Sequence, residues 1–146
     1  MDTGGPSRID ISAVRRFANR AATRNASAVD VLAREVELRM IERLAMVKLT
    51  PKRILDAGCG RFPAFEALRA KYRDADVVAI DVAANAIVAA IAQRTLAGRV
   101  RQMFGASRTH AVCGDFSRLP LAAGSIDFIW SNLALGARTE EGLFNE

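Results

Sequence analysis

The sequence predicts an α/β fold, a parallel sheet with both of its faces covered. Three observations lead to this prediction: short, mainly apolar runs, helical patterns between them, and glycine or acidic residues directly after the runs. Uninterrupted apolar strands that alternate with helices are typical of parallel sheets, whose strands are buried on both sides. The strands are expected at residues 53–57, 77–82, 110–113 and 126–131.

Two helices are predicted before the first strand. Residues 1–12 have the composition of a loose polar arm, and a short basic helix is expected over residues 13–22. A longer helix is predicted for residues 28–47, because apolar residues recur there at steps of three and four. Its buried face would consist of Val29, Leu32, Val36, Met40, Leu44 and Val47. Thr50-Pro51 ends this helix, since proline disfavours helical geometry in the residue before it.

The remaining connections are predicted from the same patterns. Helices are expected at residues 63–72 and 83–96, a basic loop or frayed helix end at 98–109, and a turn at 120–125.

Composition excludes several classes of protein. The chain of 146 residues is 51% hydrophobic, which excludes a disordered chain, and it has no apolar run long enough to predict a membrane span. Its net charge of +5 resides in residues 1–53, which carry 11 Lys or Arg and 6 Asp or Glu, so a uniformly basic nucleic-acid binder is not expected. With two cysteines and no secretory signal, the sequence predicts a cytoplasmic protein with free thiols, Cys113 lying in the core.

The most informative residues follow the first predicted strand. Gly58 and Gly60 predict a tight turn at the carboxyl end of that strand, where open α/β sheets bind ligands. The two glycines alone would also fit an ordinary strand-to-helix turn. Asp56 adds chemical information, because a carboxylate there would repel a pyrophosphate but would hold an ammonium group. S-adenosylmethionine has such an amine and no phosphate.

The next two strands also end in acidic residues. Asp81 closes the second strand, 25 residues after Asp56. A carboxylate at about this distance along the chain is expected to bind the two hydroxyls of a ribose. Asp115 and Phe116 close the third, where a carboxylate beside an aromatic ring suits an adenine. Asp115 by itself is more typical of a helix or turn cap than of a ligand contact. Three acidic strand ends in this order favour a nucleoside ligand.

Residues 53–132 resemble the class I S-adenosylmethionine-dependent methyltransferases. The motifs that carry the resemblance are Leu55–Gly60, Ile80-Asp81, Cys113–Phe116 and Asp127–Asn132. The resemblance implies a Rossmann-like parallel sheet and S-adenosyl-L-methionine as cofactor. The residues implied to bind the cofactor are Asp56, Ala57, Gly58, Cys59, Gly60, Asp81, Val82, Asp115, Phe116, Asn132 and Leu133.

A narrower resemblance covers residues 14–135. Arg16-Phe17, Arg20–Ala22, the helix Leu32–Leu44, Leu119–Leu121 and Trp130–Leu135 are similar to the biotin-synthesis malonyl-[acyl-carrier-protein] O-methyltransferases. This resemblance implies methylation of the free carboxyl of a malonyl thioester, with an acyl-carrier protein as partner. It requires no catalytic side chain and no metal, because the acceptor is already ionised and the donor is already activated.

The basic residues of the first helix admit two interpretations. Arg15, Arg16, Arg20 and Arg24 could steer an acidic carrier protein towards the site, or they could form a solvated helix face.

The chain also departs from the family. The position of a third glycine is occupied by Phe62, which would narrow the space at the methionine end of the cofactor. The family's sheet has seven strands in the order 3-2-1-4-5-7-6, and only the first four are expected here, so the chain is predicted to be truncated at its C-terminal end. The expected division is an N-terminal arm and helical lid at residues 1–50 and a truncated cofactor-binding domain at residues 51–146.

Two consequences follow from the missing strands. The apolar fourth strand would be an exposed edge, which predicts self-association. The alternatives to an active malonyl methyltransferase are a non-catalytic, degenerate fragment and a related methyltransferase with another acceptor.

Overall fold

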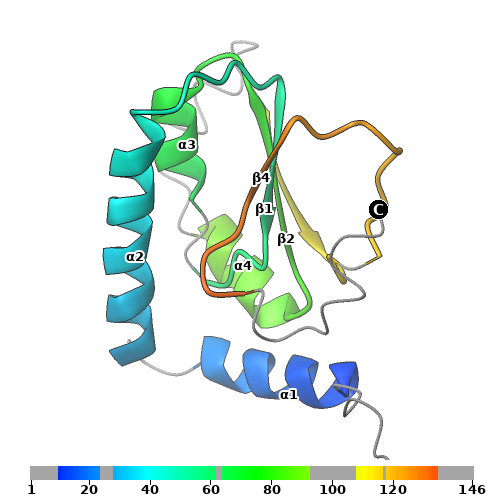
Figure 1. Cartoon of the computed structure of the whole chain (residues 1–146). Helices are drawn as coiled ribbons and strands as arrows, with labels where there is room; N and C mark the ends of the chain where they lie inside the picture. Colours follow the sequence, from blue (N-terminus) through cyan, green and yellow to red (C-terminus); the bar gives the residue numbers. More distant parts are fainter. Residues whose placement is uncertain (1–9, 24–27, 62–63, 93–107, 117, 135–146) are drawn as a thin grey trace, which may run out of the picture.

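Four parallel strands form one sheet at the centre of the protein (Figure 1). The computed structural model describes residues 10–23, 28–61, 64–92, 108–116 and 118–134. The strand order is β3-β2-β1-β4, which matches the first four strands of the predicted sheet. The strands are β1 (Arg53–Ala57), β2 (Asp76–Asp81), β3 (Thr109–Cys113) and β4 (Phe128–Trp130). In this register Ile54 of β1 lies opposite Val77 on β2 and Phe128 on β4.

The four predicted helices are present, with shifted ends. They are α1 (Ile11–Ala22), α2 (Ala28–Leu44), α3 (Phe65–Lys71) and α4 (Ala84–Ala92). Asp10 begins α1 as its N-cap, because its carboxylate accepts a hydrogen bond of 2.8 Å from the Ser12 N–H. After Leu44 the chain turns before Pro51, as predicted. The segment 93–107, which includes most of the predicted basic loop, lies outside the described residues.

One face of the sheet packs against α2, α3 and α4. Ile54, Val77 and Ala79 of the strands form one buried cluster with Leu68 of α3 and with Tyr72, the residue that directly follows this helix. The Tyr72 and Phe128 rings meet edge to face with their centres 6.1 Å apart, which joins the end of α3 to β4. This face holds most of the buried apolar side chains.

The other face is covered by the segment between β3 and β4. Leu55, Val78 and Ile80 point to this face, because successive residues of a strand alternate sides. The covering side chains are Phe116, Leu119, Leu121 and Ile126, and they pack together with Val112 of β3. Both faces are therefore covered as predicted, but in the described part of the chain an irregular segment covers the second face.

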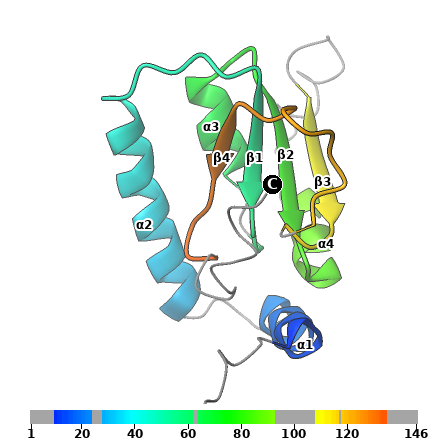
Figure 2. The same ribbon diagram turned by 45° about the vertical axis from the view of Figure 1, so that its right-hand side comes forward.

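The predicted apolar face of α2 is only partly correct. Met40, Ile41 and Leu44 pack against the core, whereas Leu32 is 54% exposed and Val47 is also exposed. The core contacts lie in the C-terminal half of the helix. The N-terminal half extends past the end of the sheet, so its side chains have no core to enter (Figure 2).

The fourth strand is shorter than predicted and covers residues 128–130. Ile129 is 59% exposed, in agreement with the predicted exposed edge, because among the described strands β4 is flanked only by β1. One other burial prediction is wrong. Cys113 is exposed, since it ends β3, the outermost strand on the other side. Within the described residues, no helix is both long and apolar enough to cross a membrane.

Asp127 fastens the start of β4 to the start of β1. Its Oδ2 accepts hydrogen bonds of 2.9 Å from the backbone N–H groups of both Lys52 and Arg53. Its own N–H donates to the Arg53 carbonyl at 3.0 Å. The two N–H groups lower the pKa of the Asp127 carboxyl, because they bind the ionised form.

We predict that Asp127→Ala lowers the Tm at pH 7, because two backbone donors lose their acceptor. A carboxyl whose folded pKa is lowered stabilises the fold above its ordinary pKa of about 3.9, and this contribution is lost as the pH falls through the folded value. The difference in Tm between wild type and variant should therefore shrink below about pH 4. Thermal unfolding followed by circular dichroism measures it, with exposed Asp74→Ala as control. Equal Tm values for Asp127→Ala and wild type at pH 7 would contradict this role.

Candidate functional site

A cavity of about 500 Å³ opens at the carboxyl ends of the strands. Its walls are the turns after β1 and β2, the segments after β3 and β4, and the facing sides of α1 and α2. Figures 1 and 2 show α1 lying across this end of the sheet, with α2 alongside β4. The parallel sheet thus brings residues far apart in the sequence to one place, which is where α/β sheets bind ligands.

The glycine turn after β1 forms the floor of the cavity. Gly58 has a φ of +73°, and its N–H donates to the Ile80 carbonyl at 2.8 Å. A Cβ atom at this position would collide with the Ala134 side chain, so the turn admits no larger residue without movement. Gly60 also has a left-handed φ, +58°, which a residue with a side chain rarely adopts.

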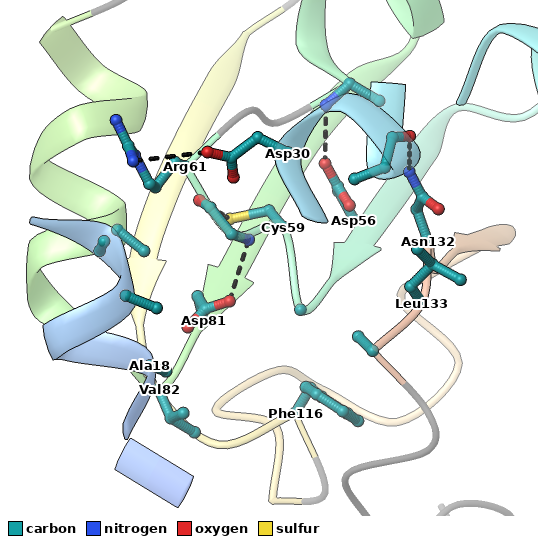
Figure 3. A pocket seen from close by; sticks show the side chains of 18 of the residues that line it. Ala18, Asp30, Asp56, Cys59, Arg61, Asp81, Val82, Phe116, Asn132 and Leu133 are labelled. Carbon is teal, nitrogen blue, oxygen red and sulfur yellow. Dashed lines mark hydrogen bonds and ion pairs between the residues drawn. The ribbon is translucent and has the colours of Figure 1, made fainter. Parts of the chain in front are cut away.

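Asp81 organises both turns at this end of the sheet. Its Oδ2 accepts a hydrogen bond of 2.9 Å from the Gly60 N–H, and its Oδ1 accepts one of 2.8 Å from the Ala83 N–H (Figure 3). One carboxylate therefore holds the glycine turn and the start of α4. Each oxygen can accept more than one hydrogen bond, so the carboxylate retains capacity towards a ligand.

Asp56 is nearly inaccessible to solvent, with 2% of its surface exposed. Its Oδ2 accepts a hydrogen bond of 3.0 Å from the Ala64 N–H, which joins β1 to the start of α3 (Figure 3). Burial raises the pKa of Asp56 to about 7; the Ala64 N–H opposes this shift, and the charges of Glu37 and Asp81 add to it. A cation in the cavity would favour the ionised form of this carboxyl.

Cys59 lies between the two glycines and is buried. Burial, together with the Asp56 and Asp81 carboxylates, raises the pKa of the Cys59 thiol well above its ordinary value. The thiolate is the nucleophilic form of cysteine, so this thiol is not activated. Cys59 is therefore a buried residue of the turn and not an activated nucleophile.

Three contacts attach the N-terminal helices to the sheet domain. Asn132, directly after β4, donates from Nδ2 to the Ala33 carbonyl of α2 at 2.7 Å (Figure 3). Arg61 and Asp30 form an ion pair at 3.6 Å with both side chains about four-fifths buried. On the other side, Asn19 of α1 accepts a hydrogen bond of 3.0 Å from the Asn85 N–H of α4.

The segment after β4 shows two further features of a binding site. The Oδ1 of Asn132 is buried and has no hydrogen-bond partner among the described residues. Leu133, the next residue, has a φ of +58°, which is strained for a residue with a side chain. Both residues line the cavity.

The cavity favours a cationic or neutral ligand over a phosphate. Among its described lining residues are four carboxylates and two guanidinium groups: Asp30, Glu37, Asp56, Asp81, Arg34 and Arg61. Two of these, Asp30 and Arg61, pair with each other. Within the part of the chain that the structure describes, no group of three or more His, Cys, Asp or Glu residues is arranged to hold a metal ion.

The structure brings most of the predicted site residues together. Those that line the cavity are Asp56, Gly58, Cys59, Gly60, Asp81, Val82, Phe116, Asn132 and Leu133. Ala57 is buried in the core behind the turn, and Asp115 precedes Phe116 without being part of the cavity wall.

Sequence reasoning missed the helical half of the cavity. α2 contributes Asp30, Ala33, Arg34 and Glu37, and α1 contributes Val14, Phe17, Ala18, Ala21 and Ala22. A signal was present in α2, because residues spaced by three, four and seven positions share one helix face. Asp30, Arg34 and Glu37 form such a polar stripe on the part of the helix that lacks core contacts.

Comparison with known proteins supports a common fold and family. A family model described as a methyltransferase domain matches residues 55–140. The malonyl-[acyl-carrier protein] O-methyltransferase of Methylovorus sp. (strain MP688) is 50% identical over 128 residues, and that of Gallionella capsiferriformans (strain ES-2) is 41% identical over 127 residues. Each alignment covers 87% of this chain and 42% of the relative, so the chain spans about two fifths of the length of these proteins.

Two solved structures have the same fold. Geranyl diphosphate C-methyltransferase from Streptomyces coelicolor A3(2) superposes with a TM-score of 0.65 and 15% identity, over 96% of this chain and 60% of that one. Magnesium protoporphyrin IX methyltransferase from Synechocystis PCC 6803 gives a TM-score of 0.63 and 17% identity, over 94% and 69% of the two chains. With the family match over most of the sheet domain, the predicted relationship is confirmed: the chain belongs to the methyltransferase-domain family.

Proposed function

We propose that the cavity binds S-adenosyl-L-methionine and that the protein transfers its methyl group to an acceptor. The observation that carries the proposal is the pair of acidic strand ends, Asp56 and Asp81, held by backbone N–H groups in one cavity whose other walls are largely apolar. These two hydrogen-bond-accepting carboxylates fit a nucleoside that carries an ammonium group and no phosphate. The family match supports the same assignment.

The cofactor would lie across the strand ends in the order of the chain. Asp56, Ala57, Gly58, Cys59 and Gly60 would border its amino-acid end, with Ala57 contributing backbone only because its side chain is in the core. Asp81 and Val82 would bind the ribose, and Asp115 and Phe116 the adenine. Asn132 and Leu133 would lie near the reacting methyl group, where the buried Oδ1 of Asn132 has accepting capacity to spare.

The domain division is part of the proposal. Residues 1–50 would form an arm and helical lid, and residues 51–146 a cofactor-binding domain. The lid assignment is supported by α1 and α2, which supply one side of the cavity and are joined to the sheet domain by Asn85, Arg61 and Asn132.

For the acceptor, we propose the free carboxyl of malonyl-[acyl-carrier protein], the substrate named for the curated relatives. The first helix supports a carrier of acidic character, because Arg15, Arg16 and Arg20 are exposed while Phe17 of the same helix borders the cavity. Opposite charge on a carrier would raise its association rate more than its affinity. A cytoplasmic location is part of this proposal, and the exposed free thiol of Cys113 suits a reducing compartment.

The proposed reaction requires no catalytic side chain. When bound, S-adenosylmethionine supplies a methyl group already activated on a sulfonium. A malonyl carboxylate is ionised at neutral pH, so no general base is needed: a carboxyl oxygen forms the new bond to the methyl carbon as the sulfur–carbon bond breaks, which gives a methyl ester and a neutral thioether. The residues of this chain would bind and orient the reactants and exclude water.

We predict that Asp81→Asn weakens S-adenosylmethionine binding by about tenfold or more, because a charged acceptor of the ribose hydroxyls becomes a neutral one. Isothermal titration calorimetry measures the affinity, with exposed Asp74→Asn as a control for the same chemical change. Binding of equal strength by Asp81→Asn and wild type would contradict the ribose assignment. A wild-type chain that binds nothing at millimolar ligand would overturn the proposed function.

We predict that the chain transfers a labelled methyl group from S-adenosylmethionine to malonyl-[acyl-carrier protein] and leaves acetyl-[acyl-carrier protein] unlabelled. Acetyl thioester is the matched control because it lacks the free carboxyl. Mass spectrometry of the carrier protein detects the methyl ester. A chain that binds the cofactor but labels neither carrier would contradict this acceptor and favour a non-catalytic protein or a different acceptor.

The exposed edge at β4 supports the prediction of self-association. Ile129 is 59% exposed on a strand that has β1 as its only neighbour in the described sheet. Light scattering should give a mean mass that rises with concentration, and Ile129→Lys should lower that mass because a charge blocks edge pairing. Val88→Lys, an exposed apolar position on α4, is the control. A monodisperse monomer at high concentration would contradict the prediction.

A further inference from the structure

Glu37 is a carboxylate of the cavity that the motifs of the sheet domain do not include. It lies on α2, about one turn after Ala33, and lines the same cavity as Asp56 and the glycine turn. The Ala33 carbonyl accepts the 2.7 Å hydrogen bond from Asn132, and this bond fixes that part of α2 beside the end of β4. Glu37 is therefore positioned by the contact that joins α2 to the end of β4.

The environment of Glu37 disfavours its own negative charge. Burial raises the pKa of Glu37, although the Arg34 guanidinium on the same helix acts in the opposite direction. Its charge also raises the pKa of Asp56, so the two carboxylates, which line the same cavity, repel each other. A cation between them would relieve the repulsion on both sides.

The other carboxylates of the cavity are better satisfied. Asp30 pairs with Arg61 at 3.6 Å, and Asp81 accepts two backbone hydrogen bonds. Asp56 accepts one, from Ala64. Glu37 and Asp56 are thus the least compensated carboxylates of the cavity, and Asp56 directly precedes the glycine turn.

The chemistry of the ligand decides which group belongs there. An acceptor carboxylate would be repelled by Glu37, so this residue does not serve the methyl acceptor. An ammonium group carries a positive charge and three donors, enough for two carboxylates of one cavity. A ribose or an adenine carries no charge that would offset the repulsion.

We infer that Glu37 is an additional ligand-positioning residue, which receives the ammonium group of the cofactor's amino-acid moiety from the helical side while Asp56 receives it from the sheet side. The inference rests on the proposed cofactor. It gives α2 a direct share in recognising the amino-acid end of the ligand, in addition to covering the cavity.

Three nucleosides test this inference with Glu37→Gln, which keeps the shape of the side chain and removes its charge. S-adenosylmethionine and S-adenosylhomocysteine both carry the ammonium group, and 5′-methylthioadenosine lacks it. Calorimetry should show affinities for the first two weakened alike, by about tenfold, which is the effect of removing one charge-assisted hydrogen bond. The affinity for 5′-methylthioadenosine should stay within about twofold of wild type, which also shows that the variant is folded. Glu42→Gln, an exposed position on the same helix, is the control and should bind all three as wild type does.

Each other outcome overturns the inference in a recognisable way. Equal weakening of all three ligands would give Glu37 a general structural role. Weakening of S-adenosylmethionine alone would assign Glu37 to the sulfonium, and no weakening would remove it from ligand binding. If the wild-type chain bound none of the three, the proposed function itself would fail, and this inference with it.

Discussion

Parallel pairing of β1 with both β2 and β4 is the constraint from which the cavity follows. In this register Ala57 lies opposite Ile80, so β1 and β2 end together and the Gly58 N–H reaches the Ile80 carbonyl. Asp81 then stands one residue further on, within reach of the glycine turn. A slip of one residue would send every side chain of a strand to the other face and would move Asp56 away from the cavity. The acidic strand ends are thus a product of register as much as of sequence.

Asp56 is a buried carboxyl whose charge the fold must stabilise. A carboxyl with 2% of its surface exposed and one backbone donor is poorly compensated when it is ionised. Such a residue is tolerated at the end of a well-packed strand, where Ile54 and Leu55 are buried completely or almost so. Departures from ordinary burial rules are typical of functional positions, which the rest of the core must stabilise.

Much of the sheet domain was predictable, because the relevant signals are local. The strands at Arg53–Ala57 and Asp76–Asp81 are mainly apolar, and the carboxylates at their ends and the glycines after β1 mark the turns. Burial was less predictable, since it depends on neighbours far along the chain. Cys113 was predicted to lie in the core but is exposed, because it ends β3, an outermost strand of the described sheet.

The contribution of α2 could not be foreseen for the same reason. Glu37 and Asp30 become cavity residues because Asn132 and Arg61, both far along the chain, hold this helix beside the strand ends. A periodic pattern indicates which side chains share a face of a helix, but it does not indicate what that face will meet.

The seam between α1 and α4 has a consequence for the width of the cavity. It is formed by alanines, Ala18 and Ala22 on one side and Ala83 and Ala86 on the other, which let the two segments approach closely. Ala83 is fully buried and does not line the cavity. Its small side chain nevertheless allows α1 to pack closely against the start of α4. The size of the cavity therefore depends partly on the methyl group of Ala83, which does not line the cavity. Evolution could widen or close this cavity by changing side-chain volume at the seam, with every polar group of the site left as it is.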